Sequence, residues 1–325
     1  MQGQADPTMT SVRLNPTPVP FADRLAEFPI VLEVVPPHRR ASDRAVGQLL
    51  HRLEKAMRGN STIDAVNIPE VLDENHEGDP FYRNLDPRAF AMRLLDLVRV
   101  ETIVNKVVVH FPSGARFESW ARESLDDFRL RNVVLVGGTR HEVEYPGPDI
   151  VRANEILGAL SGSRRDVTIG NIAIPERRGE VDRLVRKTRA GCRFFTTQVL
   201  FEPDLVSSVL REYGEACTAE RLRPATVLLS FAPVSDYHDV EFLVWLGASI
   251  APATEEALLA HRGRAPGAAS LDVARSIWTH IRDDMAGSQP HVPLGVNIEE
   301  ISAHNFDLAV EMARAFPSWN RSTST

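Results

Sequence analysis

Ile30-Val31-Leu32-Glu33-Val34-Val35-Pro36-Pro37 is the stretch of sequence that decides the fold. Apart from the prolines and one glutamate it is wholly apolar, which is typical of a strand buried on both sides in a parallel α/β sheet. The prolines stop the strand and leave Glu33 at its carboxyl end, where α/β barrels and open sheets carry their chemistry. An ionised Glu33 is costly to bury, so it needs a partner, a raised pKa or a catalytic task. At this point a structural tie to a nearby arginine explains it equally well.

Seven further segments of strand character follow, and segments with apolar residues at helical spacing separate them. After the first, the expected strands cover residues 63–68, 104–111, 132–136, 166–173, 194–200, 224–231 and 292–298. The expected helices cover residues 41–57, 88–98, 114–130, 149–160, 175–190, 205–217, 236–246, 255–285 (with an internal loop) and 302–316. Eight strands, each followed by a helix, predict a single (β/α)8 TIM barrel. No Gly-x-Gly-x-x-Gly follows a strand, which argues against an open dinucleotide-binding sheet.

Composition and charge place limits on the class of protein. We expect one barrel domain over residues 25–317, a flexible leader at 1–24 and a loose tail at 318–325. A net charge of −7 without a basic run argues against nucleic acid as a partner. The two cysteines lack metal-site spacing, so we expect a reducing cytoplasm and no structural metal. No apolar run approaches the roughly 20 residues of a membrane span, so no membrane partner is expected. The possibility of a homo-oligomer stays open.

Polar residues near the expected strand ends are the candidate site, because the carboxyl ends of barrel strands converge on one mouth. The candidates are Glu33, Glu70 or the acids that follow it up to Asp79, His110, Asn171 and Gln198. His110 could instead be a hydrogen-bonded core histidine, and the acidic segment a solvated loop. A buried amide such as Gln198 needs several hydrogen-bond partners at once, which suits recognition of a heterocycle.

Two further segments could contact a ligand through backbone or charge. Gly137-Gly138 ends the fourth expected strand, and a glycine backbone allows close approach. Arg177-Arg178 lies at the start of the fifth expected helix, whose N-terminus would favour an anion. The arginine pair could equally be surface charge.

Taken in order along the chain, these residues resemble the methylenetetrahydrofolate reductase family from about residue 30 to residue 316. The similar features are the strand ending in Glu33 before a proline pair, the strand-three His110, and a block that contains Pro175-Glu176, Glu180, Lys187, Ala190-Gly191 and Phe195-Thr196-Thr197-Gln198. No single piece is specific, whereas the ordered set is fairly so.

The resemblance implies reduction of 5,10-methylenetetrahydrofolate to 5-methyltetrahydrofolate by a reduced nicotinamide, a reaction of one-carbon metabolism and methionine biosynthesis. Glu33 would be the catalytic acid, which protonates the tetrahydrofolate ring system as the methylene bridge opens to an iminium. The implied substrate contacts are Gln198, His110, Glu70 and Phe231. The implied cofactor contacts are Asn171, Glu176, Arg178, Glu180, Lys187, Gly137 and Gly138.

Departures from the family pattern concern the flavin. Most members hold FAD partly by a Leu-Arg-Gly-Asp turn, which here reads Leu135-Val136-Gly137-Gly138, and the Tyr-Pro-Glu turn reads Ile174-Pro175-Glu176. The chain is more similar to the flavin-independent reductases of actinobacteria, including mycobacteria, in its Ile68-Pro69 before an acidic loop and its Leu228-Leu229-Ser230-Phe231 strand.

The flavin-independent resemblance implies that NADH passes hydride directly to the folate and that no FAD is bound. A second carboxylate after strand two, Glu77 or Glu74, would assist. The alternatives are the same reaction with FAD or a deazaflavin, and a folate-binding paralogue without turnover. The choice between NADH and NADPH stays open.

Overall fold

The computed structural model describes residues 19–58, 62–98, 100–138, 140, 142–162, 166–260 and 267–321. Eight parallel strands close into a barrel in the order β1-β10-β9-β8-β7-β6-β5-β2, which confirms the predicted (β/α)8 fold. They are β1 (Ile30–Glu33), β2 (Ala65–Ile68), β5 (Glu101–Val107), β6 (Asn132–Val136), β7 (Thr168–Ala173), β8 (Phe194–Val199), β9 (Thr226–Phe231) and β10 (Leu294–Glu299).

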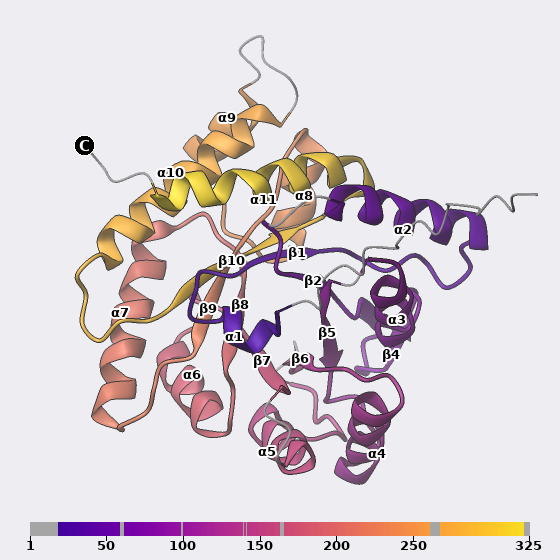
Figure 1. Cartoon of the computed structure of the whole chain (residues 1–325). Helices are drawn as coiled ribbons and strands as arrows, with labels where there is room; N and C mark the ends of the chain where they lie inside the picture. Colours follow the sequence, from indigo (N-terminus) through magenta and orange to yellow (C-terminus); the bar gives the residue numbers. More distant parts are fainter. Residues whose placement is uncertain are drawn as a thin grey trace, which may run out of the picture.

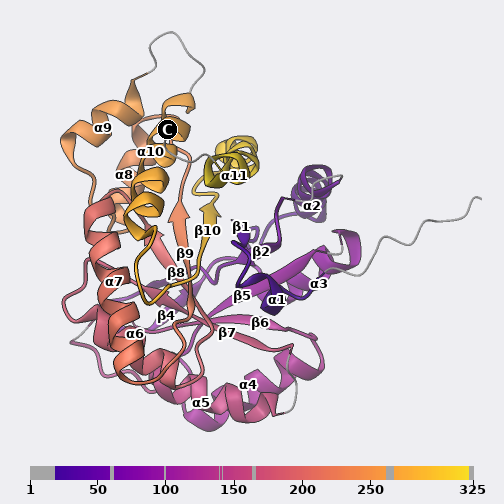
Figure 2. The same cartoon turned by 60° about the vertical axis from the view of Figure 1, so that its left-hand side comes forward.

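Helices surround these strands (Figures 1 and 2). They are α2 (Asp43–Met57), α3 (Pro87–Val98), α4 (Gly114–Asp126), α5 (Ile150–Ser161), α6 (Glu180–Arg189), α7 (Pro203–Ala219), α8 (Tyr237–Trp245), α9 (Pro252–Leu259), α10 (Ala268–Met285), the 3-10 turn η1 (Ala303–Asn305) and α11 (Phe306–Arg321). Alternate strand residues such as Leu32 and Val66 join the large core between strands and helices, while Val31 and Ala65 belong to a second, inner cluster. That alternation assigns each strand residue to the lumen or to the helical layer. No helix of the described part of the chain is long and apolar enough to cross a membrane.

A short helix, α1 (Phe21–Arg24), closes the amino end of the barrel and lies near its centre in Figure 1. Phe21 is fully buried and meets Phe194 edge-on at 5.4 Å between ring centroids. Thr226 Oγ1 donates to the carbonyl of Leu25 at 2.7 Å. The predicted flexible leader is therefore too long, because Phe21 and Leu25 plug the lumen from below. Its residues 1–18 lie outside the described part.

Several element boundaries differ from those predicted. The third barrel strand spans Glu101–Val107 rather than 104–111, so His110 follows the strand. Helix α6 begins at Glu180, not at 175, because Gly179 adopts a left-handed conformation with φ 73° just before it. The expected helical segment 255–285 forms α9 and α10, and α9 begins three residues earlier than expected.

Two segments are more ordered than predicted. The acidic segment after β2 contains an antiparallel hairpin of β3 (Leu72–Glu74) and β4 (Pro80–Tyr82). Helix α11 continues through the expected tail to Arg321, and Trp319 packs on Phe316 at 4.7 Å between centroids. Tail residues 322–325 lie outside the described part.

Candidate active site

Glu33 lies in the barrel lumen at the carboxyl end of β1. Val31, two residues earlier on the same strand, belongs to the inner apolar cluster, so alternation directs Glu33 inward as well. Its carboxylate accepts hydrogen bonds from Asn67 Nδ2 at 2.5 Å and Asn297 Nδ2 at 3.2 Å. Its partners are thus amides of the two neighbouring strands, and the structural tie to an arginine is not what the structure shows.

A second carboxyl group, Glu299, lies beside Glu33. The two residues are paired in register on β1 and β10. Asn297 Nδ2 lies 3.2 Å from Glu33 Oε2 and 3.4 Å from Glu299 Oε1, so one amide lies between both carboxyl groups. The same nitrogen is 3.2 Å from Ser230 Oγ on β9. We name Glu33 and Glu299 the carboxyl pair.

Burial makes the carboxyl pair hard to ionise. It raises the pKa of Glu33 to about 7, although the hydrogen bonds from Asn297 and Asn67 act to lower it. Burial, and then the neighbouring charge of Glu33, raise the pKa of Glu299 well above the ordinary value. A carboxyl group with a pKa near neutrality is protonated often enough to act as a general acid at physiological pH.

Amide groups of three lumen strands carry unused hydrogen-bonding capacity. The Oδ1 atoms of Asn67, Asn105 and Asn297 are buried and have no partner among the described residues. Buried amide oxygens are rarely left unpaired, so these acceptors call for water or for a donor-bearing ligand. The lumen above the apolar plug is therefore lined by polar side chains, with the carboxyl pair on one side.

The acids after β2 do not join the carboxyl pair. Glu70 accepts from Lys106 Nζ at 2.5 Å and from the Val107 amide at 2.9 Å, which ties the loop to β5. Glu74 lies 2.9 Å from His110 Nε2 and accepts from Tyr145 Oη at 2.9 Å. Glu77, predicted to assist catalysis, lies at the hairpin turn with 69% of its side chain exposed. Its exposure removes the basis for that role, which needs a group held in the mouth.

The structure therefore supports the alternative interpretation of His110 as a hydrogen-bonded core histidine. Its side chain is only 2% exposed, and its ring meets Tyr145 edge-on at 5.3 Å between centroids. With Glu74 and Tyr145 it links the β3–β4 hairpin to the loops after β5 and β6. The structure brings neither His110 nor Glu70 into contact with Glu33.

Three predicted cofactor contacts lie within the helical layer instead of the mouth. Asn171 is fully buried, and its amide exchanges hydrogen bonds with Asn154 of α5 at 2.8 and 3.1 Å. Glu180 is also buried and accepts from the Ile174 amide at 3.1 Å. Lys187 donates to the Ile172 carbonyl at 2.7 Å. Alternation turns Asn171 outward from β7, so these residues fasten α5 and α6 to the barrel, contrary to prediction.

The glycine pair after β6 packs against two side chains of the protein, although Gly138 itself is exposed. A β-carbon at Gly138 would overlap the ring of Tyr145, and one at Gly137 would contact Ile150. The close approach that a glycine permits at position 138 is used by the ring of Tyr145. Glu176 and Arg178 are exposed in the turn between β7 and α6, on the mouth side.

The two remaining predicted substrate contacts differ in position. Gln198 is partly exposed near the end of β8, and its Nε2 lies 3.5 Å from the Leu246 carbonyl just beyond α8. It stays available to a ligand at the rim. Phe231 is buried on the outer side of β9 against Phe316 of α11, at 5.1 Å between centroids. Phe231 is therefore a core residue and does not line the lumen.

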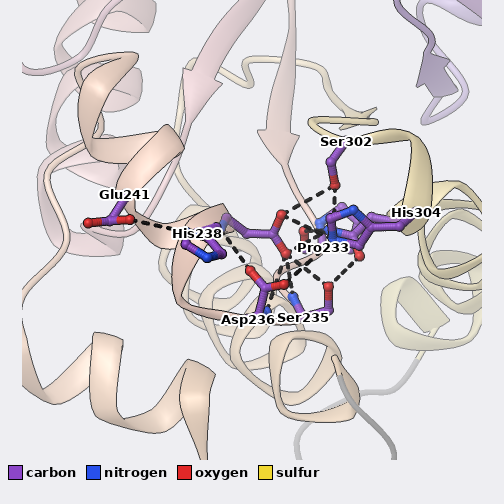
Figure 3. A network of polar contacts seen from close by, with 9 residues as sticks. Pro233, Ser235, Asp236, His238, Glu241, Ser302 and His304 are labelled. Carbon is purple, nitrogen blue, oxygen red and sulfur yellow. Dashed lines mark hydrogen bonds and ion pairs between the residues drawn. The ribbon is translucent and has the colours of Figure 1, made fainter.

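A separate polar cluster, away from the carboxyl pair, joins the loops after β9 and β10 (Figure 3). Oxygen or nitrogen atoms of Asp236, Asp239 and His304 lie within 4.8 Å of one another, close enough to hold a metal ion. Asp239 Oδ2, however, already accepts from the amide and hydroxyl of Ser235 and from Asn305 Nδ2. Burial acts to raise the pKa of Asp239, but these hydrogen bonds outweigh it and hold the pKa below its ordinary value. The cluster is a helix cap that ties α8 to η1.

A cavity of about 560 Å³ lies at the opposite, amino end of the barrel. It lies between α1 and the starts of β8 and β9, and its lining includes Asp23, Arg193 and Arg223. It does not reach the carboxyl pair, and active sites of TIM barrels form at the carboxyl ends of the strands. We therefore place the candidate site at the lumen mouth.

The fold and site together define the class of protein as a (β/α)8 barrel with two carboxyl groups and several amides in its mouth. A solved structure of an uncharacterized protein from Clostridium thermocellum, described as binding two copies of 5-methyl-5,6,7,8-tetrahydrofolic acid, is similar with a TM-score of 0.72 and 18% identity. The match covers 91% of this chain and 98% of that one. At this identity the likeness establishes the fold.

Other comparisons add little. A putative deoxyribose-phosphate aldolase from Coccidioides immitis matches 67% of this chain and 76% of its own at a TM-score of 0.40 and 10% identity, too weak to support an argument. No model of a known protein family matches the chain, and no curated protein matches it significantly.

Sequence reasoning missed five lumen residues: Asn67, Asn105, Ser230, Asn297 and Glu299. The signal was present, since each lies an even number of residues from a lumen-facing position on its strand. The eighth strand was predicted to end at Ile298, one residue short of Glu299. Applying the two-residue period to each strand would have turned all five toward the lumen, although only barrel closure brings Glu299 beside Glu33.

Proposed function

We propose that this chain reduces 5,10-methylenetetrahydrofolate to 5-methyltetrahydrofolate with a reduced nicotinamide dinucleotide as the hydride donor. The observation that carries the proposal is Glu33, a lumen carboxyl group whose pKa burial raises to about 7. The reaction needs an acid to protonate the amine that leaves as the methylene bridge opens. Once ionised, the same group would stabilise the iminium that accepts the hydride.

The lumen amides support a heterocyclic substrate. The unpaired oxygens of Asn67, Asn105 and Asn297 are acceptors, and a pterin ring presents several N–H donors. The solved structure with the same fold is described as binding a methyltetrahydrofolate, and the likeness extends over nearly the whole of both chains. Gln198 at the rim is the remaining candidate from the family resemblance for contact with the pterin.

Direct transfer from NADH, without bound FAD, is part of the proposal. The sequence lacks the arginine and aspartate of the flavin turn, and the ring of Tyr145 packs against Gly138 in that turn. Purified protein tests this point, because a yellow preparation with a flavin absorption band would contradict it. Comparing NADH with NADPH as donors would settle the preference between them.

The decisive experiment measures NADH oxidation that depends on methylenetetrahydrofolate. We expect Glu33→Gln to lower the rate about 10²–10⁴-fold, because the variant keeps the shape but has no proton to donate. Glu77→Gln is the matched control and should retain the wild-type rate within about twofold, since Glu77 is exposed at the hairpin turn. Full activity in Glu33→Gln would refute the catalytic assignment.

A folate-binding protein without turnover is the second candidate, since the unpaired lumen amides would suffice for binding. Binding of 5-methyltetrahydrofolate without any NADH oxidation in the wild type would favour that reading. A binder has no use for a lumen acid that is costly to bury, which is why reduction is preferred.

A further inference from the structure

The carboxyl pair has no counter-charge. Among the described residues, no lysine, arginine or histidine forms an ion pair with Glu33 or Glu299; their side-chain partners are Asn67, Asn297 and Ser230. Two neighbouring carboxylates buried in the lumen without a cation would repel each other strongly. This arrangement is stable only if the pair retains a proton.

The charged groups on neighbouring elements are engaged elsewhere. Lys106 on β5 is bound by Glu70. Glu300, the residue that follows β10, interacts with Arg52 of α2 and Asp307 of α11 in the helical layer. Strands β2 and β9 present only the neutral side chains of Asn67 and Ser230 to the pair. The titration of Glu33 therefore depends chiefly on burial, on the amides and on Glu299.

We propose that Glu299 is a positioning residue: Glu299 and Glu33, both in reach of the Asn297 amide, hold one proton between them, so that the carboxyl pair titrates as a unit. Removing the last proton would place two negative charges in the lumen, so the pair releases it only at a pH higher than either group would show alone. Asn297 Nδ2, within 3.4 Å of an oxygen of each carboxyl group, holds the two groups in place.

The use of this proton in catalysis rests on the proposed function. Glu299 would keep Glu33 supplied with a proton at neutral pH. After Glu33 transfers its proton to the leaving amine, both groups would be anionic beside the iminium, and the pair would regain one proton from solvent before the next turnover. No redox change occurs at either carboxyl group.

Infrared spectroscopy tests the shared proton without any assay of activity. The C=O stretch of a protonated carboxyl group is followed from pH 5 to pH 10 in a Glu300→Gln background, because burial also raises the pKa of Glu300 to about 7. We expect the last protonated band of the wild-type pair to disappear at least about one pH unit higher than the single band of Glu33→Gln or Glu299→Gln. Either variant suffices if the other fails to fold.

Identical midpoints for the pair and for both single variants would overturn the proposal, as would the absence of any protonated band at pH 7. If the protein is an active reductase, Glu299→Gln should move the basic limb of its pH–rate profile down by about one unit, a roughly tenfold loss of rate above that limb that acidification recovers. A purely structural role would lower the rate equally at every pH. A positive infrared result with no reductase activity would uphold the proton pair and contradict the proposed function.

Discussion

At the residue scale, the chemistry of the lumen is set by the cost of ionising a buried carboxyl group. Asn67 and Asn297 each donate one hydrogen bond to Glu33, but burial outweighs them and its pKa rises to about 7. The folded protein therefore keeps a proton that the unfolded chain releases above pH 4.5. A raised folded-state pKa gives stability that is complete at low pH and is lost as the pH rises.

This linkage predicts a difference between wild type and Glu33→Gln in urea unfolding. Between pH 5 and pH 8 the wild type loses unfolding free energy that the variant does not, so the variant gains about 1–3 kcal/mol relative to it. The window follows from the rise of the Glu33 pKa from 4.5 to about 7. Glu77→Gln serves as the control and should track the wild type. Parallel curves for wild type and Glu33→Gln would show that Glu33 is not buried in its neutral form.

At the element scale, the loops on the mouth side are held by contacts among themselves. The β3–β4 hairpin contributes Glu74, the segment after β5 contributes His110, and the loop after β6 contributes Tyr145, all joined through the Glu74 carboxylate. Tyr145 then lies on Gly138, where a side chain would displace it. The hairpin and its acids therefore contact the neighbouring loops on the mouth side and not the carboxyl pair.

Substitution of glycine by alanine tests this packing. Gly138→Ala should lower the unfolding free energy by about 1–3 kcal/mol, because the new methyl group pushes Tyr145 off Glu74. Gly47→Ala, in the exposed middle of α2 with no atom within 4 Å of the added methyl, should instead raise it by about 0.5–1 kcal/mol. Chemical denaturation of both variants gives the two values. A neutral Gly138→Ala would mean that Tyr145 does not rest there in solution.

At the scale of the whole molecule, the barrel is plugged at one end and polar at the other. The inner apolar cluster of Val31, Ala65, Ile103, Val134, Phe194 and Leu228 is sealed from below by Phe21 and Leu25. Above it, the lumen is lined by the polar residues Glu33, Asn67, Asn105, Ser230, Asn297 and Glu299. A ligand therefore reaches the carboxyl pair through the carboxyl-end mouth.

The plug predicts the effect of truncating Phe21. Phe21→Ala should lower the unfolding free energy by about 3–5 kcal/mol, because it leaves a void against Phe194 in the closed lumen. Val19→Ala, two residues earlier and 46% exposed, should change it by less than about 0.5 kcal/mol. Thermal or urea unfolding of the two variants measures both changes in unfolding free energy. Equal and small effects would show that α1 does not close the barrel.

Local patterns predicted the elements well where they extend over several turns or a full strand. The strand that holds Glu33 and the helix that became α2 needed only periodicity and a stop signal to be placed. Each strand of the β3–β4 hairpin is three residues long and α1 is four residues long, too short for any period to show. Residue roles were less predictable, since Asn171 and Phe231 have the right type near the right strand ends but face the helical layer.

The sequence by itself determined the (β/α)8 barrel and the place of Glu33 at its mouth, because alternating strand and helix periods and a proline stop are local signals. Only the tertiary structure decided what surrounds Glu33. Glu299 is 266 residues further along the chain, and barrel closure in one register between β1 and β10 is what brings them together. The same closure paired Glu70 with Lys106 and Glu74 with His110, and left the carboxyl pair with the neutral side chains of Asn67, Asn297 and Ser230. Pairing of distant strands is a property of the closed sheet, which no local pattern encodes.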